Sequence, residues 1–115
     1  MENETLISSY DEINDTFVGK IEGKNGYCAD YGISEGIYLI VDKNNLPTSV
    51  LVDGASEVFD VSKDFLENPN IKIGIDCDGI CICFSIFIEE LKVCSVKCKN
   101  KFGIPEISFV MDSNS

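Results

Sequence analysis

The sequence predicts an α+β fold in which an N-terminal helix packs on a mainly antiparallel β-sheet, built of hairpins and a meander and curled partly toward a barrel. The helix is indicated by apolar residues that recur at helical spacing near the N-terminus. The sheet is indicated by composition, because the chain has 15 Ile and 9 Val against 6 Leu and 2 Ala, and β-branched residues favour strands. The length of 115 residues predicts a single domain, residues 1–115.

The predicted N-terminal helix covers about residues 4–17. Its apolar positions are separated by four, three and four residues, which places them on one helical face: Leu6, Tyr10, Ile13 and Phe17. Asn3 or Thr5 is in position to cap the N-terminus of this helix. The opposite face of the helix is acidic. We therefore expect either a surface helix that docks on the sheet or a helix whose acidic face contacts a partner.

The β-rich body is expected to span residues 17–111. The predicted strands are residues 17–21, 26–29, 36–42, 48–53, 56–61, 71–75, 80–88, 91–98 and 104–110. Residues 36–61 are expected to form a three-stranded meander, with Asp53-Gly54 as a two-residue hairpin turn. Ser62 is placed to cap a single helical turn before Asn68-Pro69. The polar tail, residues 112–115, is expected to fray.

The predicted core combines the apolar face of the helix with the inward faces of the strands. Its members are Leu6, Tyr10, Ile13, Phe17, Ile37, Leu39, Val41, Val50, Val52, Ile73, Ile82, Phe84, Ile86 and Val93. Residues 80–88 and 91–98 are expected to form a hairpin around Glu89 and Glu90. With a two-residue bend, Cys81 faces Cys98, and four cysteines share one face: Cys81, Cys83, Cys94 and Cys98. A slip of one residue in register would destroy this arrangement.

The cysteines support an alternative interpretation, a zinc- or thiol-stabilised adaptor. Its metal ligands would be Cys77, Cys81, Cys94 and Cys98, whose spacing is symmetric. A disulfide between Cys81 and Cys98 is a further option for an oxidising compartment. The favoured interpretation is that these cysteines act as small hydrophobic side chains, so neither a metal nor a cofactor is expected.

The charge is strongly negative and unevenly distributed. The formal net charge is −11, from 20 acidic residues and 9 lysines, with neither Arg nor His. Residues 1–67 contain 14 acidic residues and 4 lysines, whereas residues 68–115 contain 6 and 5. This asymmetry predicts one distinctly acidic part of the surface. It disfavours direct binding to nucleic acid or to a membrane and favours a basic protein partner.

The leading hypothesis is a small non-enzymatic binding protein that neutralises a basic partner by steric and electrostatic occlusion. The partner would be a nucleic-acid-binding enzyme or a toxin. Anti-CRISPR inhibitors of host defence and toxin-immunity proteins are similar in their compact, acidic composition. The candidate partner-binding residues are acids of the first half: Asp11, Glu12, Asp15, Glu22, Asp30, Glu35, Asp53, Glu57, Asp60 and Asp64. A β-rich subunit that self-assembles through its strand edges is another alternative, so a monomer or a homodimer is expected.

Enzymatic function is not expected from the sequence. Because the chain has no His, the Cys–His and Ser–His arrangements of nucleophilic catalysis are excluded. There is also no P-loop and no G-x-G-x-x-G motif. The acidic start of the chain does not resemble a secretory signal, and the longest apolar run covers only residues 80–88. A cytoplasmic location is therefore predicted.

Overall fold

The computed structural model describes residues 2–114 and consists mostly of β-structure, with 56% strand and 8% helix. The first five strands are β1 (Glu2–Asp11), β2 (Thr16–Ile21), β3 (Ala29–Ser34), β4 (Ile37–Val41) and β5 (Pro47–Asp53). Two short helices and four further strands follow: α1 (Ala55–Phe59), α2 (Lys63–Leu66), β6 (Ile71–Cys77), β7 (Cys81–Ile88), β8 (Leu91–Lys99) and β9 (Ile107–Asp112). The predicted α+β class is therefore wrong, because the N-terminal segment adds strands to the sheet.

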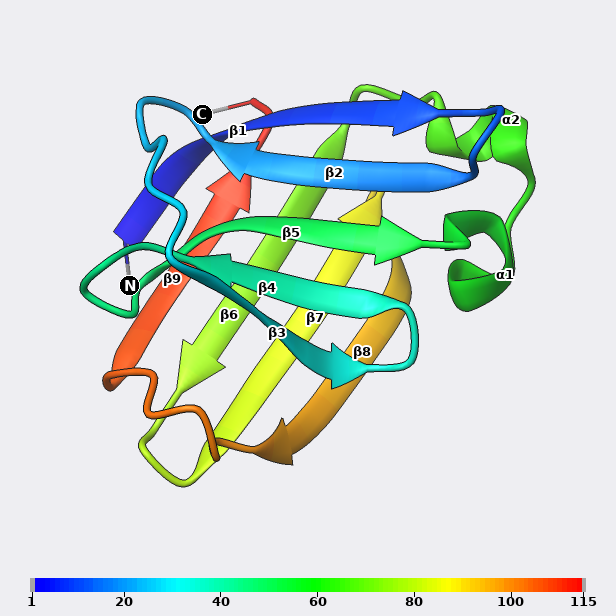
Figure 1. The fold of residues 1–115 in the computed structure, drawn as a ribbon. Helices are drawn as coiled ribbons and strands as arrows, with labels where there is room; N and C mark the ends of the chain where they lie inside the picture. The colour runs from blue at the N-terminus through cyan, green and yellow to red at the C-terminus, as the bar shows by residue number, and fades with distance from the viewer. Residues whose placement is uncertain (1, 115) are drawn as a thin grey trace.

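All nine strands belong to one sheet, in the order β3-β4-β5-β2-β1-β9-β6-β7-β8. Every pairing is antiparallel except that of β1 with β9. Figure 1 shows two layers: β2, β5, β4 and β3 cross over β9, β6, β7 and β8, and β1 is paired with both layers. This folding brings the two edge strands, β3 and β8, close together, so the sheet is nearly closed and barrel-like.

The core lies between the two layers and follows the two-residue alternation of the strands. In β6, for example, every second residue from Ile71 to Cys77 is buried. The predicted core residues that are buried are Leu6, Phe17, Ile37, Leu39, Val41, Val50, Val52, Ile73, Ile82, Phe84 and Ile86. Tyr10 and Val93 are partly buried against this core. Ile13 is a clear error, since its side chain is 92% exposed.

The segment predicted as a helix over residues 4–17 forms the β1–β2 hairpin. Tyr10 in β1 is directly opposite Phe17 in β2, so both can face the core without a helix. Ile13 lies in the turn, which Asp11 closes by accepting hydrogen bonds from the backbone N–H groups of Ile13 and Asn14 at 3.0 and 3.2 Å. The four-residue spacing failed as a helix signal because residues four apart also share a face in a strand.

Two further predictions on the first layer need correction. The three-stranded meander predicted over residues 36–61 instead consists of β3, β4 and β5. Its first strand is the one expected at residues 26–29, which begins later, at Ala29. The strand expected at residues 56–61 does not form, because residues 56–59 belong to α1, which follows Gly54 with its φ of 71°. The helix turns Ala55 and Phe59 into the core, where the ring of Phe59 meets Phe17 edge to face.

The predicted helical turn after Ser62 is confirmed as α2. The hydroxyl of Ser62 accepts a hydrogen bond from the N–H of Phe65 at 3.2 Å, as an N-cap does. The tail expected to fray is tied to β6 over its described part: Ser113 Oγ accepts from the N–H of Ile71 at 2.9 Å. Ser115 lies outside the described residues. Within residues 2–114, neither helix has the length and apolar character needed to cross a membrane.

The register of the β7–β8 hairpin differs from the prediction by one residue beyond the bend. Ile88 is opposite Leu91, as expected, but a β-bulge follows and places Ile86 opposite Cys94. Consequently Cys98 is opposite Ile82, while Cys81 is opposite Lys99. The shared cysteine face is therefore wrong, because the extra residue in β8 turns the cysteines of the two strands to opposite faces.

Candidate functional site

Eight of the ten predicted partner-binding acids lie at one end of the sheet, and we call this surface the acidic end. Its members are Asp11, Glu12, Asp15, Glu35, Asp53, Glu57, Asp60 and Asp64. They lie in the β1–β2 turn, the β3–β4 turn, the end of β5 and the two helices, all on the right of Figure 1. The remaining two, Glu22 and Asp30, lie beyond the end of β2 and near the start of β3, at the other end.

Strand register explains why these separate segments meet. Thr16, the first residue of β2, is opposite Asp11 of β1 on one side and Asp53 of β5 on the other. The N–H of Asp53 donates to the carbonyl of Gly36 at 2.8 Å, which holds the β3–β4 turn beside the end of β5. The ammonium of Lys63 donates to the carbonyl of Glu12 at 3.0 Å and brings α2 to the β1–β2 turn.

Asp15 has a structural role at the acidic end. Its carboxylate accepts hydrogen bonds from the hydroxyl of Tyr10 at 2.6 Å and from the N–H and hydroxyl of Ser56 at 3.0 and 2.7 Å. Partial burial opposes ionisation of Asp15, but these hydrogen bonds outweigh it and hold the pKa of the carboxyl below its usual value. Burial and the bond to Asp15 raise the pKa of Tyr10. Asp15 is therefore engaged within the protein.

Asp11 also stabilises the fold locally. Besides the two turn N–H groups, its carboxylate accepts a 2.7 Å bond from the side-chain amide of Asn14, and this bond makes the largest contribution to lowering the pKa of Asp11. The six other acids of this end have exposed side chains: Glu12, Glu35, Asp53, Glu57, Asp60 and Asp64. These six are the residues best placed to meet a partner.

Two further residues, which were not predicted to belong to a site, lie beside the acidic end. Glu67 follows α2, is exposed, and contributes to raising the pKa of Tyr10. The capping signal at Ser62, which predicts α2, would have placed Glu67 with Asp64. Ile13 is almost fully exposed at the tip of the β1–β2 turn, next to Glu12. The sequence did not show that Ile13 lies in a turn, because the segment was predicted as a helix. In the hairpin, Ile13 offers a partner an apolar contact surrounded by acidic residues.

A groove of about 640 Å³ opens between the acidic end and the edge strand β8. One wall carries Glu35, Asp53 and Glu57, from the β3–β4 turn, the end of β5 and α1. The other wall is the first half of β8, including the half-buried side chains of Val93 and Val96. The groove therefore joins an acidic rim to an apolar surface and an unpaired strand edge.

The cysteines proposed as metal ligands are distributed over different environments. Cys77 is buried in the core, and burial raises the pKa of its thiol to about 11. Cys94 and Cys98 lie on the inner face of β8 and are half-buried, whereas Cys81, also half-buried, lies on the outer face of β7 opposite Lys99. Among residues 2–114, no group of three or more His, Cys, Asp or Glu side chains is arranged to hold a metal ion.

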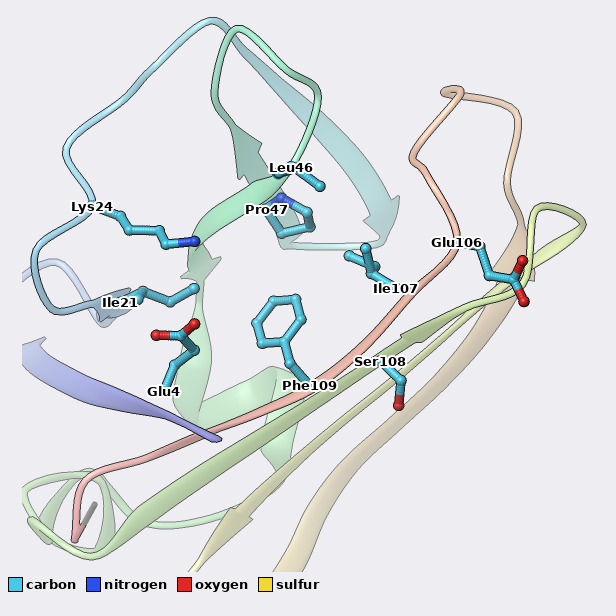
Figure 2. A pocket seen from close by; sticks show the side chains of 9 residues that line it. All are labelled: Glu4, Ile21, Lys24, Leu46, Pro47, Glu106, Ile107, Ser108 and Phe109. Carbon is cyan, nitrogen blue, oxygen red and sulfur yellow. The ribbon is translucent and has the colours of Figure 1, made fainter. Parts of the chain in front are cut away.

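A second hollow, of about 300 Å³, lies at the opposite end of the sheet from the acidic end. Figure 2 shows the ammonium of Lys24 and the carboxylate of Glu4 on either side of Ile21, facing the ring of Phe109. Glu106 points away from this space. The two charges that face the hollow are opposite in sign, so it lacks the single-sign field that concentrates an ionic ligand.

Comparisons with known proteins identify no relative: no family model, curated protein or solved structure matches the chain. The surfaces just described are therefore the features of the protein that bear on its function. Of these, the acidic end is the surface that collects acids from five separate segments.

Proposed function

We propose that this protein is a non-enzymatic binding protein that neutralises a basic protein partner by covering its cationic surface with the acidic end. The observation that carries the proposal is the grouping of eight of the ten candidate acids at one end of the sheet. A charge that served only solubility would not need to be gathered in this way. The two structural acids, Asp11 and Asp15, stabilise the segments that present the other six.

Electrostatics define how such binding would work. A predominantly acidic surface, as this end is despite Lys63, steers an oppositely charged protein into contact and accelerates association, an effect that salt screens. Charge alone gives limited affinity, because exposed ion pairs contribute roughly 0.2–1 kcal/mol each. Exposed Ile13 adds an apolar contact next to Glu12, of the kind that stabilises the centre of an interface. The partner most suited to this surface has a basic, functionally important patch, such as a nucleic-acid-binding site.

Affinity capture with charge-matched variants tests this proposal. The acidic-end variant combines Glu12→Gln, Glu57→Gln, Asp60→Asn and Asp64→Asn, all at exposed positions. The control variant combines Glu22→Gln, Asp30→Asn, Asp76→Asn and Glu106→Gln, exposed positions away from that end. Both remove four negative charges, so they differ only in where the charge is lost. Each is immobilised and exposed to nuclease-treated lysate of the source cells.

The expected result is a basic protein that the wild-type chain and the control retain in low salt and release in high salt. The acidic-end variant should bind it about tenfold more weakly or worse, because several charge contacts are lost together. Equal capture by the two variants would contradict the proposal, as would a captured protein whose binding does not respond to salt. Circular dichroism of each variant verifies that the fold is retained.

A further inference from the structure

The backbone of β8 is available for pairing along the groove. The N–H of Asn100 donates to the carbonyl of Ile80, on the side of β7. Because backbone groups alternate in direction along an antiparallel pair, those of Lys97 and Ser95 point away from β7. Within the part of the chain that the structure describes, β8 is the last strand in the sheet order and no strand pairs with it on that side, where β3 and α1 approach it without pairing. An unpaired edge of this kind is a template for an added strand.

The groove side of this edge is apolar. The bulge in β8 places Cys94 and Val96 opposite Ile86 and Phe84, on the face that continues into the core. Their side chains are only half-buried, since β8 is the last strand of its layer. The stacked rings of Tyr31 and Phe102, with centroids 4.6 Å apart, close the space between β3 and the loop after β8. The groove thus lies where the nearly closed sheet stays open.

We propose that this groove binds an extended segment of the basic partner, which adds to β8 as a further strand; this inference rests on the function proposed above. Charge complementarity identifies the occupant: side chains of the added strand that point into the groove face Glu35, Asp53 and Glu57. Lys or Arg at such positions reaches these exposed carboxylates, while an apolar neighbour covers Val96.

Lysines on the outer face of β8 limit which side chains the added strand can carry on its own outer face. Lys92, Lys97 and Lys99 are exposed on that face. They repel a segment that is basic on both faces, so the segment carries neutral or acidic side chains on its outer face. The same lysines disfavour pairing between the β8 strands of two copies, because like charges would then lie across from one another. A segment of another protein is therefore the occupant that this edge favours.

The test uses random nine-residue peptides displayed on phage and selected on the full-length chain. Selected peptides are synthesised, and their affinities are measured by fluorescence anisotropy. They should combine β-branched residues with Lys or Arg on alternate positions, and bound peptide should slow alkylation of Cys94 by N-ethylmaleimide. Each peptide is also made with its backbone amides methylated at either set of alternate positions. Strand addition predicts that one set loses at least tenfold in affinity and the other does not.

Variants of the chain provide the matching test. Ser95→Pro removes the N–H that points away from β7 and should weaken peptide binding at least tenfold, while Ser95→Thr should retain it. Glu35→Gln with Glu57→Gln should weaken binding severalfold and reduce its dependence on salt. Should Ser95→Pro fail to fold, the methylated peptides still decide the question with the wild-type chain.

Three outcomes would overturn strand addition: equal binding of both methylated series, unchanged reactivity of Cys94, or a homodimer of the wild-type chain that Ser95→Pro dissociates. The proposed function fails separately. If the acidic-end variant loses the captured partner while Ser95→Pro keeps it, strand addition is wrong and the proposed function stands. If the wild-type chain captures no basic protein but selected peptides pair with β8, the proposed function is wrong and the groove is still a site for strand addition.

Discussion

Asp15 and Ser56 lie 41 residues apart in the sequence and are joined by two hydrogen bonds, from the N–H of Ser56 at 3.0 Å and from its hydroxyl at 2.7 Å. The carbonyl of Asp15 also accepts the N–H of Ala55 at 2.9 Å. These contacts fasten the β1–β2 turn to α1 and hold two parts of the acidic end in a fixed relation. The geometry of the acidic end therefore depends on the carboxylate of Asp15, which is engaged in hydrogen bonds within the protein.

Replacing Asp15 should destabilise the protein in a pH-dependent way. Loss of its charged hydrogen bonds in Asp15→Ala should cost about 2 kcal/mol in the free energy of unfolding. Because the folded state lowers the pKa of Asp15, its contribution is present above the usual Asp pKa of about 4 and is lost as the pH falls below it. Urea unfolding at several pH values should show a smaller loss of stability in acid for Asp15→Asn than for wild type. Identical pH dependence would contradict this role.

Gly36 should not tolerate a side chain. Its φ is +78°, and an added Cβ would lie 2.7 Å from the carbonyl oxygen of Asp53. Gly36→Ala should therefore lower the free energy of unfolding by about 3 kcal/mol, through backbone strain and overpacking. Gly32→Ala is the matched control in the same hairpin, since its Cβ would make only an ordinary contact of 3.6 Å with the ring of Tyr38. If thermal unfolding shows equal losses for both variants, the close approach of the β3–β4 turn to β5 is wrong.

The cysteines should react in an order set by exposure and thiol pKa. Cys28 and Cys83 are exposed, whereas burial raises the pKa of the thiols of Cys77 and Cys94. Since the thiolate is the nucleophile, iodoacetamide near pH 8 should modify the exposed pair at least tenfold faster than Cys77. Peptide mass spectrometry over time measures the rates. Fast modification of Cys77 would contradict its place in the core, and uniform protection of the other cysteines would favour the zinc or thiol alternative.

Salt should stabilise the protein by screening repulsion at the acidic end. Neutralising Glu57 and Asp60 together, as Glu57→Gln with Asp60→Asn, should raise the free energy of unfolding in low salt by a few tenths of a kcal/mol or more. The gain should disappear near 1 M salt, where charges are screened within about 3 Å. Glu22→Gln with Asp30→Asn, at the other end, should gain less in low salt. Equal gains would indicate that repulsion is spread evenly over the surface.

Sequence patterns identified the strands best where apolar residues alternate over a long stretch. The predicted strands at residues 36–42, 48–53 and 80–88 correspond closely to β4, β5 and β7. The N-terminal segment was misassigned because Leu6 and Tyr10, four residues apart, share a face in both a helix and a strand. Pairing of β2 with β5 on its far side selects the strand, and this partner lies about thirty residues further along the chain.

The candidate site was predicted in composition but not in geometry. Excess acid in residues 1–67 indicated an acidic surface, and Glu35, Glu57 and Asp64 were correctly expected to be exposed. Asp15 could not be recognised as a structural residue, because its partner Ser56 was expected in a strand and instead lies in the first turn of α1. The groove was also hidden from the sequence, since the bulge that sets the inner face of β8 shifts the register by one residue.

The sequence by itself determined the prevalence of strands, the acidic asymmetry and the cap of α2, because each is expressed in neighbouring residues or in counts. Tertiary structure alone decided that the first segment is a hairpin, that Cys81 and Cys98 face opposite ways, and that acids from five segments meet at one end. The physical reason is that register and closure depend on pairings between distant strands. Which of these pairings is most stable depends on the side chains that are buried when the sheet packs.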